Sequence, residues 1–322
     1  MFQQILVPLD GSACSEQALV LAARLARAVD GTLYLLRIAN QEYTYASTSV
    51  AGVFVPADLA EMTDLEMKGD HAYLDKIASS SLLAGLNVVK EVRAELAIPD
   101  AILNFITSHH MEIVVMGSHG RGGLARLVLG SVAQKIAWNS PIPVLVHRVQ
   151  KPEQDEQVSE LATPIYALVP LDGSPQAEEA IVPAGLLVAA LSGAGVGSLH
   201  LVQIIKPSAH HTDEQRGQAH EEAERYLQDL AGRLRGGLAS TFQLEIKSSV
   251  YSDEQVAPTL VHIAASGDGA AAPHNLIAMT TSGRGGKRRF IMGSVAEHIL
   301  QKTPLPVLLI KPEETSEQRK DS

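Results

Sequence analysis

The feature of this chain that most constrains its fold is a duplicated segment. The run Leu6–Ser12 (Leu-Val-Pro-Leu-Asp-Gly-Ser) returns unchanged as Leu168–Ser174, 162 residues later. The runs Gly-Arg-Gly-Gly, from Gly120, and Gly-Ser-Val-Ala, from Gly130, both return 163 residues later. A shared core alone would preserve only a hydrophobic pattern, whereas glycines and an aspartate at fixed spacing indicate a backbone shape kept for a ligand or a tight turn. The chain is therefore a tandem repeat of one fold.

The repeat length sets the expected domain organisation. In a chain of 322 residues, each copy has about 150 residues, a common size for a self-contained domain. We expect one domain over 1–149, a linker over 150–163 and a second domain over 164–312. We also expect a disordered tail over 313–322, because the linker and the tail are too polar to pack.

Short apolar runs alternate with helical patterns in both copies. The first copy has strand patterns at 5–9, 32–38, 88–96 and 112–116 and a last one after Pro143, and the second copy repeats this order. Strands that read as continuous apolar runs between helices indicate a parallel sheet covered on both faces. We therefore expect an α/β fold of two tandem, doubly wound, five-stranded parallel sheets.

The first helix of each copy carries its own local signals. Ser12 and Ser174 are expected N-caps, and helices are expected to begin at Ser131 and Ser294. Pro183 falls inside the helical pattern after Ser174 and predicts a kink or an irregular middle, because proline lacks the donor N–H.

Composition excludes several classes of function. The residues are 46% hydrophobic and 19% charged, and neither copy has an apolar run of membrane-spanning length, so we expect a cytoplasmic protein with no membrane partner. A net charge of −10 argues against a broad nucleic-acid-binding surface. Cys14 is the only cysteine, which rules out an intrachain disulfide and a cysteine-rich metal site.

The glycine-rich loop of the first copy predicts an anion site. It runs from Gly117 through Gly120 to Gly130, where a helix is expected to begin at Ser131. Glycines allow several N–H groups to point into one concavity, and the N-terminal end of the helix adds its positive dipole. In an open α/β sheet this loop and Asp10 both emerge at the carboxyl ends of the strands, where ligands bind. The alternative is a glycine-rich turn without a ligand.

Taken together, these motifs resemble the universal stress protein family, and the resemblance implies a Rossmann-like, adenine nucleotide alpha-hydrolase-like fold. The resemblance rests on Val-Pro-Leu-Asp-Gly-Ser, Met-Gly-Ser-His-Gly-Arg-Gly-Gly, Leu-Gly-Ser-Val-Ala and Pro-Ile-Pro-Val-Leu-Val in that order, and it covers nearly the whole chain twice. The nucleotide-binding branch of the family carries Gly-x2-Gly-x9-Gly-Ser/Thr. The first copy matches this pattern in full at Gly117, Gly120, Gly130 and Ser131.

In the first copy the resemblance implies a site for ATP, with ADP and AMP as alternatives. The loop from Gly117 to Ser131 would hold the phosphates and ribose. Asp10 would line the nucleoside side, and Ile38 would offer its backbone to the adenine edge. Asp10 is also a candidate ligand for Mg²⁺ beside the triphosphate, because a hard cation takes carboxylate and phosphate oxygens. The alternative role for Asp10 is to cap the helix that follows.

The second copy departs from the pattern at one position. Thr280 stands where the first copy has Gly117, and its Cβ would be costly if that position required a positive φ. Binding is therefore expected in the first copy and left open in the second. The candidate residues of the second copy are Asp172, Ile204, Thr280, Gly283, Gly293 and Ser294.

The resemblance implies a sensor or regulator of the stress response that binds an adenine nucleotide and hydrolyses it slowly at most. The sequence shows a phosphate cradle without a dedicated catalytic set. An adenylyl-transferring or ATP-hydrolysing enzyme of related fold and a nucleotide-free interaction scaffold remain alternatives. Family members commonly dimerise through the last strand, so the resemblance also implies an internal pseudo-dimer between 142–148 and 305–311. Protein partners and a homodimer of whole chains stay open.

Overall fold

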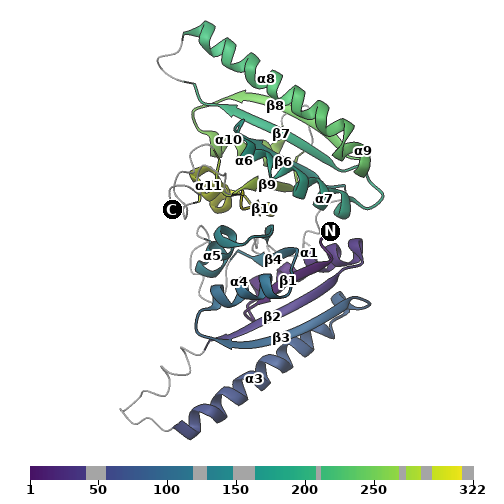
Figure 1. The fold of residues 1–322 in the computed structure, drawn as a ribbon, viewed down its shortest axis with the longest axis vertical. Coiled ribbons are helices and arrows are strands. Elements are labelled where there is room, and N and C mark those ends of the chain that lie inside the picture. The colour runs from purple at the N-terminus through teal and green to yellow at the C-terminus, as the bar shows by residue number, and fades with distance from the viewer. Residues whose placement is uncertain are drawn as a thin grey trace. The chain divides into compact units, whose positions relative to one another are not determined.

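The chain forms two compact units in the computed structural model (Figure 1). One unit comprises Met1–Arg126 with Gly130–Val149, and the other comprises Leu127–Leu129 with Gln150–Ser322. The expected linker and most of the expected tail fall outside the described residues, so the domain boundaries stay predictions. For residues 40 and 56–64 the structure describes the backbone alone. The described residues are 1–40, 56–118, 129–147, 164–207, 212–267, 273–283 and 292–313.

The first unit contains a five-stranded parallel sheet in the order β3-β2-β1-β4-β5. Its strands are β1 (Gln4–Leu9), β2 (Thr32–Asn40), β3 (Asn87–Glu95), β4 (Ile113–Gly117) and β5 (Val144–His147). Its helices are α1 (Ala13–Val29), α3 (Pro56–Ala78), α4 (Ile98–Ser108) and α5 (Ser131–Asn139), with a short 3-10 turn, η1, at Ser81–Leu83.

The second unit repeats this arrangement in the order β8-β7-β6-β9-β10. Figure 1 shows the long helices α3 and α8 each running along the outer strands of their own unit. The predicted fold class is confirmed. The strands are β6 (Tyr166–Leu171), β7 (Ser198–Ile205), β8 (Glu245–Ser252), β9 (Leu276–Thr280) and β10 (Val307–Ile310). The helices are α6 (Pro175–Glu178), α7 (Ile181–Ser192), α8 (Asp213–Gly236), α9 (Leu238–Phe242), α10 (Val256–Ser266) and α11 (Ser294–Lys302).

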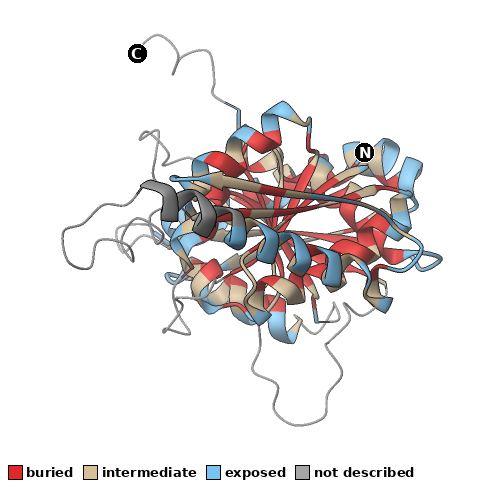
Figure 2. Ribbon diagram, turned by 90° about the horizontal axis from the view of Figure 1, so that it is seen from below, coloured by how far each residue is buried: buried red, intermediate tan, exposed pale blue. Residues whose placement is uncertain are grey.

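The apolar runs of the sequence form the core. All five residues of β4 and all five of β9 are buried, as expected for parallel strands covered on both faces. Figure 2 shows buried residues concentrated on the strands and on the inward sides of the helices. Among the residues that the structure describes, no helix is both long enough and apolar enough to cross a bilayer.

The turn after the first strand of each unit takes the shape that its sequence predicts. Gly11 and Gly173 have φ values of 77° and 79°, in the left-handed region where a Cβ is costly. The next residue is the N-cap in both units. The Ser12 side chain accepts a hydrogen bond from the N–H of Ser15, and the Ser174 side chain accepts one from the N–H of Ala177, each at 3.2 Å. Such caps stabilise a helix by about 1 kcal/mol.

Pro183 interrupts its helix as predicted, and the structure locates the break. α6 ends at Glu178 and α7 begins at Ile181, so the break lies over residues 179 and 180. Glu179 is four residues before Pro183, and a proline ring clashes with the carbonyl at that position. The corresponding helix of the first unit, α1, has no proline and runs unbroken for 17 residues.

Candidate functional site

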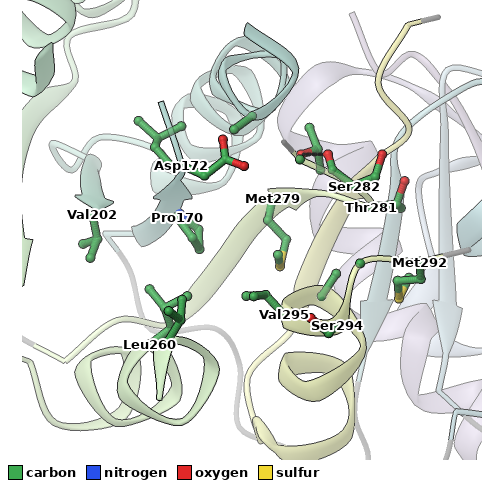
Figure 3. A pocket seen from close by; sticks show the side chains of 17 residues that line it. Pro170, Asp172, Val202, Leu260, Met279, Thr281, Ser282, Met292, Ser294 and Val295 are labelled. Carbon is green, nitrogen blue, oxygen red and sulfur yellow. Dashed lines mark hydrogen bonds between the residues drawn. The ribbon is translucent and has the colours of Figure 1, made fainter. Parts of the chain in front are cut away.

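The central strand of each sheet lies where the strand order reverses. β1 is flanked by β2 and β4, and β6 by β7 and β9, so the chain winds outward in both directions from β1 and from β6. Ligands of such sheets bind beyond the carboxyl ends of the strands at this reversal. The second unit has a cavity of about 420 Å³ at this place (Figure 3). That volume lies within the range of small-molecule sites.

Five of the six residues predicted for the second copy line this cavity. They come from three elements that are distant in sequence: the end of β6, the end of β9 and the start of α11. The sixth, Ile204, is not among the lining residues; Val202, two residues earlier on the same face of β7, is. The five lining residues are Asp172, Thr280, Gly283, Gly293 and Ser294.

The remaining wall of the cavity is mostly apolar, and the sequence analysis missed it. In Figure 3, Leu260 and Val295 lie across the cavity from Asp172 and Ser282. Pro170 could have been found, because it belongs to the duplicated run. Leu260 could not, because only the packing of α10 brings it to the site. The apolar side chains are Pro170, Leu171, Ala177, Val202, Val256, Leu260, Met279, Met292, Val295 and Ala296.

The two ends of the glycine-rich loop are held together in the same way in both units. In the second, the N–H of Gly293 donates to the carbonyl of Thr281 at 2.8 Å. In the first, the N–H of Gly130 donates to the carbonyl of Ser118 at 2.9 Å. The chain therefore leaves the sheet and returns to begin a helix at one point. Gly120, the remaining residue of the predicted motif, lies outside the described residues.

The helix that follows this loop begins without a side-chain cap. Gly293 is the N-cap of α11 and Gly130 that of α5, and neither has a side chain to accept hydrogen bonds from the first turn. Ser294, Val295 and Ala296, which form the first turn of α11, all line the cavity. The first N–H groups of a helix have no partner within it and carry a partial positive charge. This end of the cavity therefore suits an anion.

The aspartate after the first strand shapes the turn. Asp172 Oδ1 accepts hydrogen bonds from the Ser174 N–H at 2.9 Å and from its hydroxyl at 2.5 Å. Asp10 Oδ1 accepts the same pair from Ser12, at 3.0 and 2.6 Å. The capping role considered for Asp10 is thus indirect, because Asp10 orients the serine that caps the helix, and Asp172 does the same in the second unit. The predicted role of Asp10 in binding Mg²⁺ stays a prediction.

Gly117 is required for close packing and not for its φ. A Cβ at this position would lie 2.6 Å from the carbonyl oxygen of Cys14 at the start of α1. Neither Gly117 nor Thr280 has a positive φ, so the strain considered for Thr280 does not arise. Thr280 is buried, and its hydroxyl donates to the carbonyl of Ser282 at 2.9 Å. The second unit therefore accommodates the threonine inside a hydrogen-bonded turn.

The first-unit candidates occupy matching places in their own sheet. Asp10 follows β1, Gly117 ends β4, and Gly130 and Ser131 begin α5. Ile38 is buried near the end of β2, in register with Arg93.

Two tyrosines tie the long helices to the helices that begin at these turns. Tyr73 on α3 donates to Glu16 on α1 at 3.0 Å, and Tyr226 on α8 donates to Glu178 on α6 at 2.9 Å. Burial, followed by the bond to a carboxylate, raises the pKa of both tyrosines well above their ordinary range. The sequence did not reveal this pair, because the spacing between the partners differs between the copies.

The family profile and the most similar known proteins point to the same family. The profile of the Universal stress protein family matches residues 1–148 and again 167–311. A universal stress protein of Mycolicibacterium smegmatis is 29% identical over 320 residues, which cover 96% of this chain and 97% of the relative. Universal stress protein Rv2005c of Mycobacterium tuberculosis is 30% identical over 227 residues, covering 68% of this chain and 69% of the relative.

Solved structures agree on the fold. The crystal structure of a universal stress protein from Archaeoglobus fulgidus aligns with a TM-score of 0.64 at 18% identity and covers 97% of this chain and 99% of its own. A putative universal stress protein from Pseudomonas aeruginosa aligns with a TM-score of 0.61 at 15% identity, covering 97% and 94%. Two matches to the family profile, a relative similar over the whole length and the shared fold lead to one conclusion: the chain belongs to the universal stress protein family and carries the family's domain twice.

Proposed function

We propose that this protein binds an adenine nucleotide, ATP first of all, and acts in the cytoplasm as a sensor or regulator of the stress response. The observation that carries the proposal is the cavity of the second unit, where a carboxylate, a glycine loop and an uncapped helix start converge. Its apolar wall suits a base, and its helix start suits phosphate. The duplicated sequence extends the proposal to the first unit.

The parts of the nucleotide are assigned by the chemistry of the wall. Val202, Leu260 and Met279 provide apolar surface for the adenine ring. Gly283 and the first turn of α11 line the cavity and would bind the phosphates through backbone N–H groups. The carboxylate of Asp172 lies against Gly283 and suits the ribose or a Mg²⁺ ion beside the phosphates. Asp10, Gly117, Gly130 and Ser131 would do the same in the first unit, with Ile38 and Ile204 near the base.

The scarcity of titratable side chains in the cavity wall favours a sensor over an ATP-hydrolysing or adenylyl-transferring enzyme. Asp172 is the only titratable side chain among the described residues that line the cavity, and Ser174 already holds one of its oxygens. Fast hydrolysis requires a positioned water and a base that can take its proton. We therefore expect slow turnover at most. Turnover of many ATP molecules per minute would favour the enzyme.

The direct test is to identify what the purified protein carries. Denaturing the protein and analysing the released small molecules by mass spectrometry should yield an adenine nucleotide. Calorimetry with ATP, ADP, AMP and GTP, with and without Mg²⁺, should then rank ATP first and GTP last. Failure to release any nucleotide, together with no heat of binding for ATP, would leave the nucleotide-free scaffold as the better reading.

The last strand of each unit, β5 or β10, leads to a second proposal, which concerns assembly. Within their own units β5 pairs with β4 and β10 with β9, each on one side, and an unpaired sheet edge is normally covered. We infer that 142–148 and 305–311 pair within one chain as a pseudo-dimer. Ultracentrifugation combined with hydrogen exchange tests this: a monomeric chain whose amides at Val144–His147 and Val307–Ile310 exchange slowly supports it. Rapid exchange at these edges in the monomer contradicts it, and slow exchange only in a dimer of chains indicates a homodimer instead.

A further inference from the structure

The second unit contains a chain of hydrogen bonds built on two buried histidines. His200 on β7 and His274 just before β9 are 2% and 4% exposed. Their rings are stacked with centroids 5.1 Å apart, and His200 Nδ1 lies 3.0 Å from His274 Nε2. At one end, His200 Nε2 lies 2.8 Å from the hydroxyl of Ser249 on β8. At the other, His274 Nδ1 lies 3.3 Å from the carbonyl of Ile263 on α10. We call these four residues the histidine relay.

The partners fix the protons of the relay. A carbonyl only accepts, so His274 Nδ1 carries a hydrogen and the Nε2 of a neutral His274 accepts. His200 therefore donates from Nδ1, and its Nε2 accepts from the hydroxyl of Ser249. With both rings neutral, every bond has one donor and one acceptor. A proton on His274 Nε2 would be hydrogen-bonded only if His200 changed to the tautomer that donates from Nε2 to Ser249, and a charge on either ring would lie in the core, which is costly.

The relay shares a strand and a helix with the cavity wall. His200 and Val202 are two residues apart on β7 and therefore face the same side of the sheet. Ile263 and Leu260 are three residues apart on α10 and share one side of that helix. Val202 and Leu260 line the cavity, so the relay joins a strand and a helix that both contribute to its apolar wall. Hydrating a charged relay requires these two elements to separate.

The first unit has no such relay at the matching positions. The sheet registers equate His200 with Tyr34, because each pairs with the same leucine of the duplicated run. The backbone bonds into the first strand equate His274 with Met111. In the first unit, Tyr34 and Phe105 pack edge to face with ring centroids 6.3 Å apart, and Met111 is buried. The first unit therefore serves as a comparison within one molecule; it has a histidine of its own, His147 on β5, whose pKa is lowered by burial.

The ionisable groups around the relay do not favour a charge on it. Lys247 is the register partner of His200 on β8, and it is paired with Glu245 at 3.4 Å. A cation on the same face opposes a second positive charge. Tyr166 on β6 lies on this face as well, and His262 on α10 is exposed. β9 carries no ionisable side chain. The ionisable residues of α11, which packs on α10, are Glu297, His298 and Lys302.

We propose that the histidine relay makes adenine-nucleotide binding in the second unit depend on pH. This inference rests on the proposed function and names a regulation of the same site. The site binds tightly while both rings are neutral. Below about pH 6.5, the ordinary pKa of histidine, protons bind the form of the unit in which β7 and α10 have separated, and this form competes with ATP binding. The ATP affinity then falls by up to about tenfold per pH unit for each proton taken up. The first unit lacks the relay and should lose less affinity over this range.

Hydrogen exchange of the whole protein tests this, because it reports each unit separately in one sample. Exchange is measured with and without ATP at about pH 7.5 and about pH 5.5, with intrinsic rates corrected. ATP should protect the amides of β7 and α10 from exchange at the higher pH. Most of that protection should be lost at the lower pH. Protection of β2 and α4 should persist at both. NMR of the ring nitrogens should show both relay histidines neutral at the higher pH.

The double variant His200→Tyr with His274→Met installs the residues of the first unit and should bind ATP equally at both pH values. His262→Gln, which removes an exposed histidine from the same helix, should behave as the parent does. Ser249→Ala is the milder variant if the double variant does not fold; it should shift the loss of protection to a different pH.

The outcomes separate the two proposals. Protection of the second unit that is equal at both pH values overturns the relay and leaves nucleotide binding intact. Relay histidines that are charged at the higher pH also overturn it. No protection of the second unit by ATP at either pH overturns nucleotide binding there, and the regulation with it.

Discussion

Gly283 lies so close to the carboxylate of Asp172 that a Cβ on the glycine would overlap Asp172 Oδ2. The other oxygen of the same carboxylate is held by Ser174. The glycine loop after β9 and the turn after β6 are thus in direct contact, across more than a hundred residues of sequence. This contact turns two separate motifs of the sequence into one site.

Replacing Gly283 with alanine should weaken the second site. The methyl group must displace either the carboxylate or the loop, so we expect ATP affinity in this unit to fall by about tenfold, or ~1.4 kcal/mol. Calorimetry of the full chain measures it. The control is Gly232→Ala in α8, where nothing lies within 4 Å of the added Cβ; it should leave binding unchanged and stabilise the helix by about 0.5–1 kcal/mol. Unaltered affinity in Gly283→Ala would show that the contact is irrelevant to binding.

Replacing Gly117 with alanine should destabilise the first unit. The new Cβ would lie 2.6 Å from the Cys14 carbonyl, a backbone atom that cannot move without shifting α1. We expect the free energy of unfolding to fall by about 1–3 kcal/mol, as for other overpacked sites. Urea denaturation measures it, with Gly69→Ala in α3, which meets no atom within 4 Å, as the matched control. Equal stability of the two variants would contradict the packing role.

The pair of tyrosine bonds should make stability sensitive to alkali. The folded protein raises the pKa of Tyr73 and Tyr226, so it favours their protonated form. Their contribution is fully present below the ordinary tyrosine pKa of about 10 and is lost as the pH rises above it. Thermal melting between about pH 8 and pH 11 measures the loss. The double variant Tyr73→Phe with Tyr226→Phe should be less stable at neutral pH and should lose less on going to pH 11; an unchanged pH profile would refute the assignment.

Burial should decide which ion pair of the first unit contributes to the free energy of unfolding. Arg37 and Asp70 meet at 2.9 Å with side chains only 11% and 17% exposed, and Arg37 also donates to the Leu9 carbonyl. Asp70→Asn should lower the free energy of unfolding by about 1–3 kcal/mol, because a mostly buried guanidinium loses its counter-charge. Asp75→Asn breaks the exposed pair with Lys90 and should change little, since exposed pairs contribute little. Similar losses in both variants at high salt would contradict this ranking.

The order of elements was predictable because each has a local cause. The continuous apolar runs marked β4 and β9, the serine caps marked the starts of α1 and α6, and Pro183 marked the break before α7. Glycine with a positive φ at Gly11 and Gly173 was likewise a local property of the turn.

The site was predictable in part. The duplicated motifs predicted that Asp172, Gly283 and Gly293 lie together, and all three line one cavity, because parallel strands bring their carboxyl ends to one edge. The reason given for Gly117 was incomplete, since the need for a glycine comes from the approach of Cys14 on another element.

The sequence alone determined the duplication, the fold class and the polar residues of the site, because strand period, caps and glycine turns act over a few neighbouring residues. Only the tertiary structure decided which side chains complete the site. Leu260 reaches the cavity wall, His200 meets His274, and Tyr226 meets Glu178 through the packing of distant elements. These contacts depend on how helices pack against the sheet, and no local sequence pattern encodes contacts between residues so far apart in the chain.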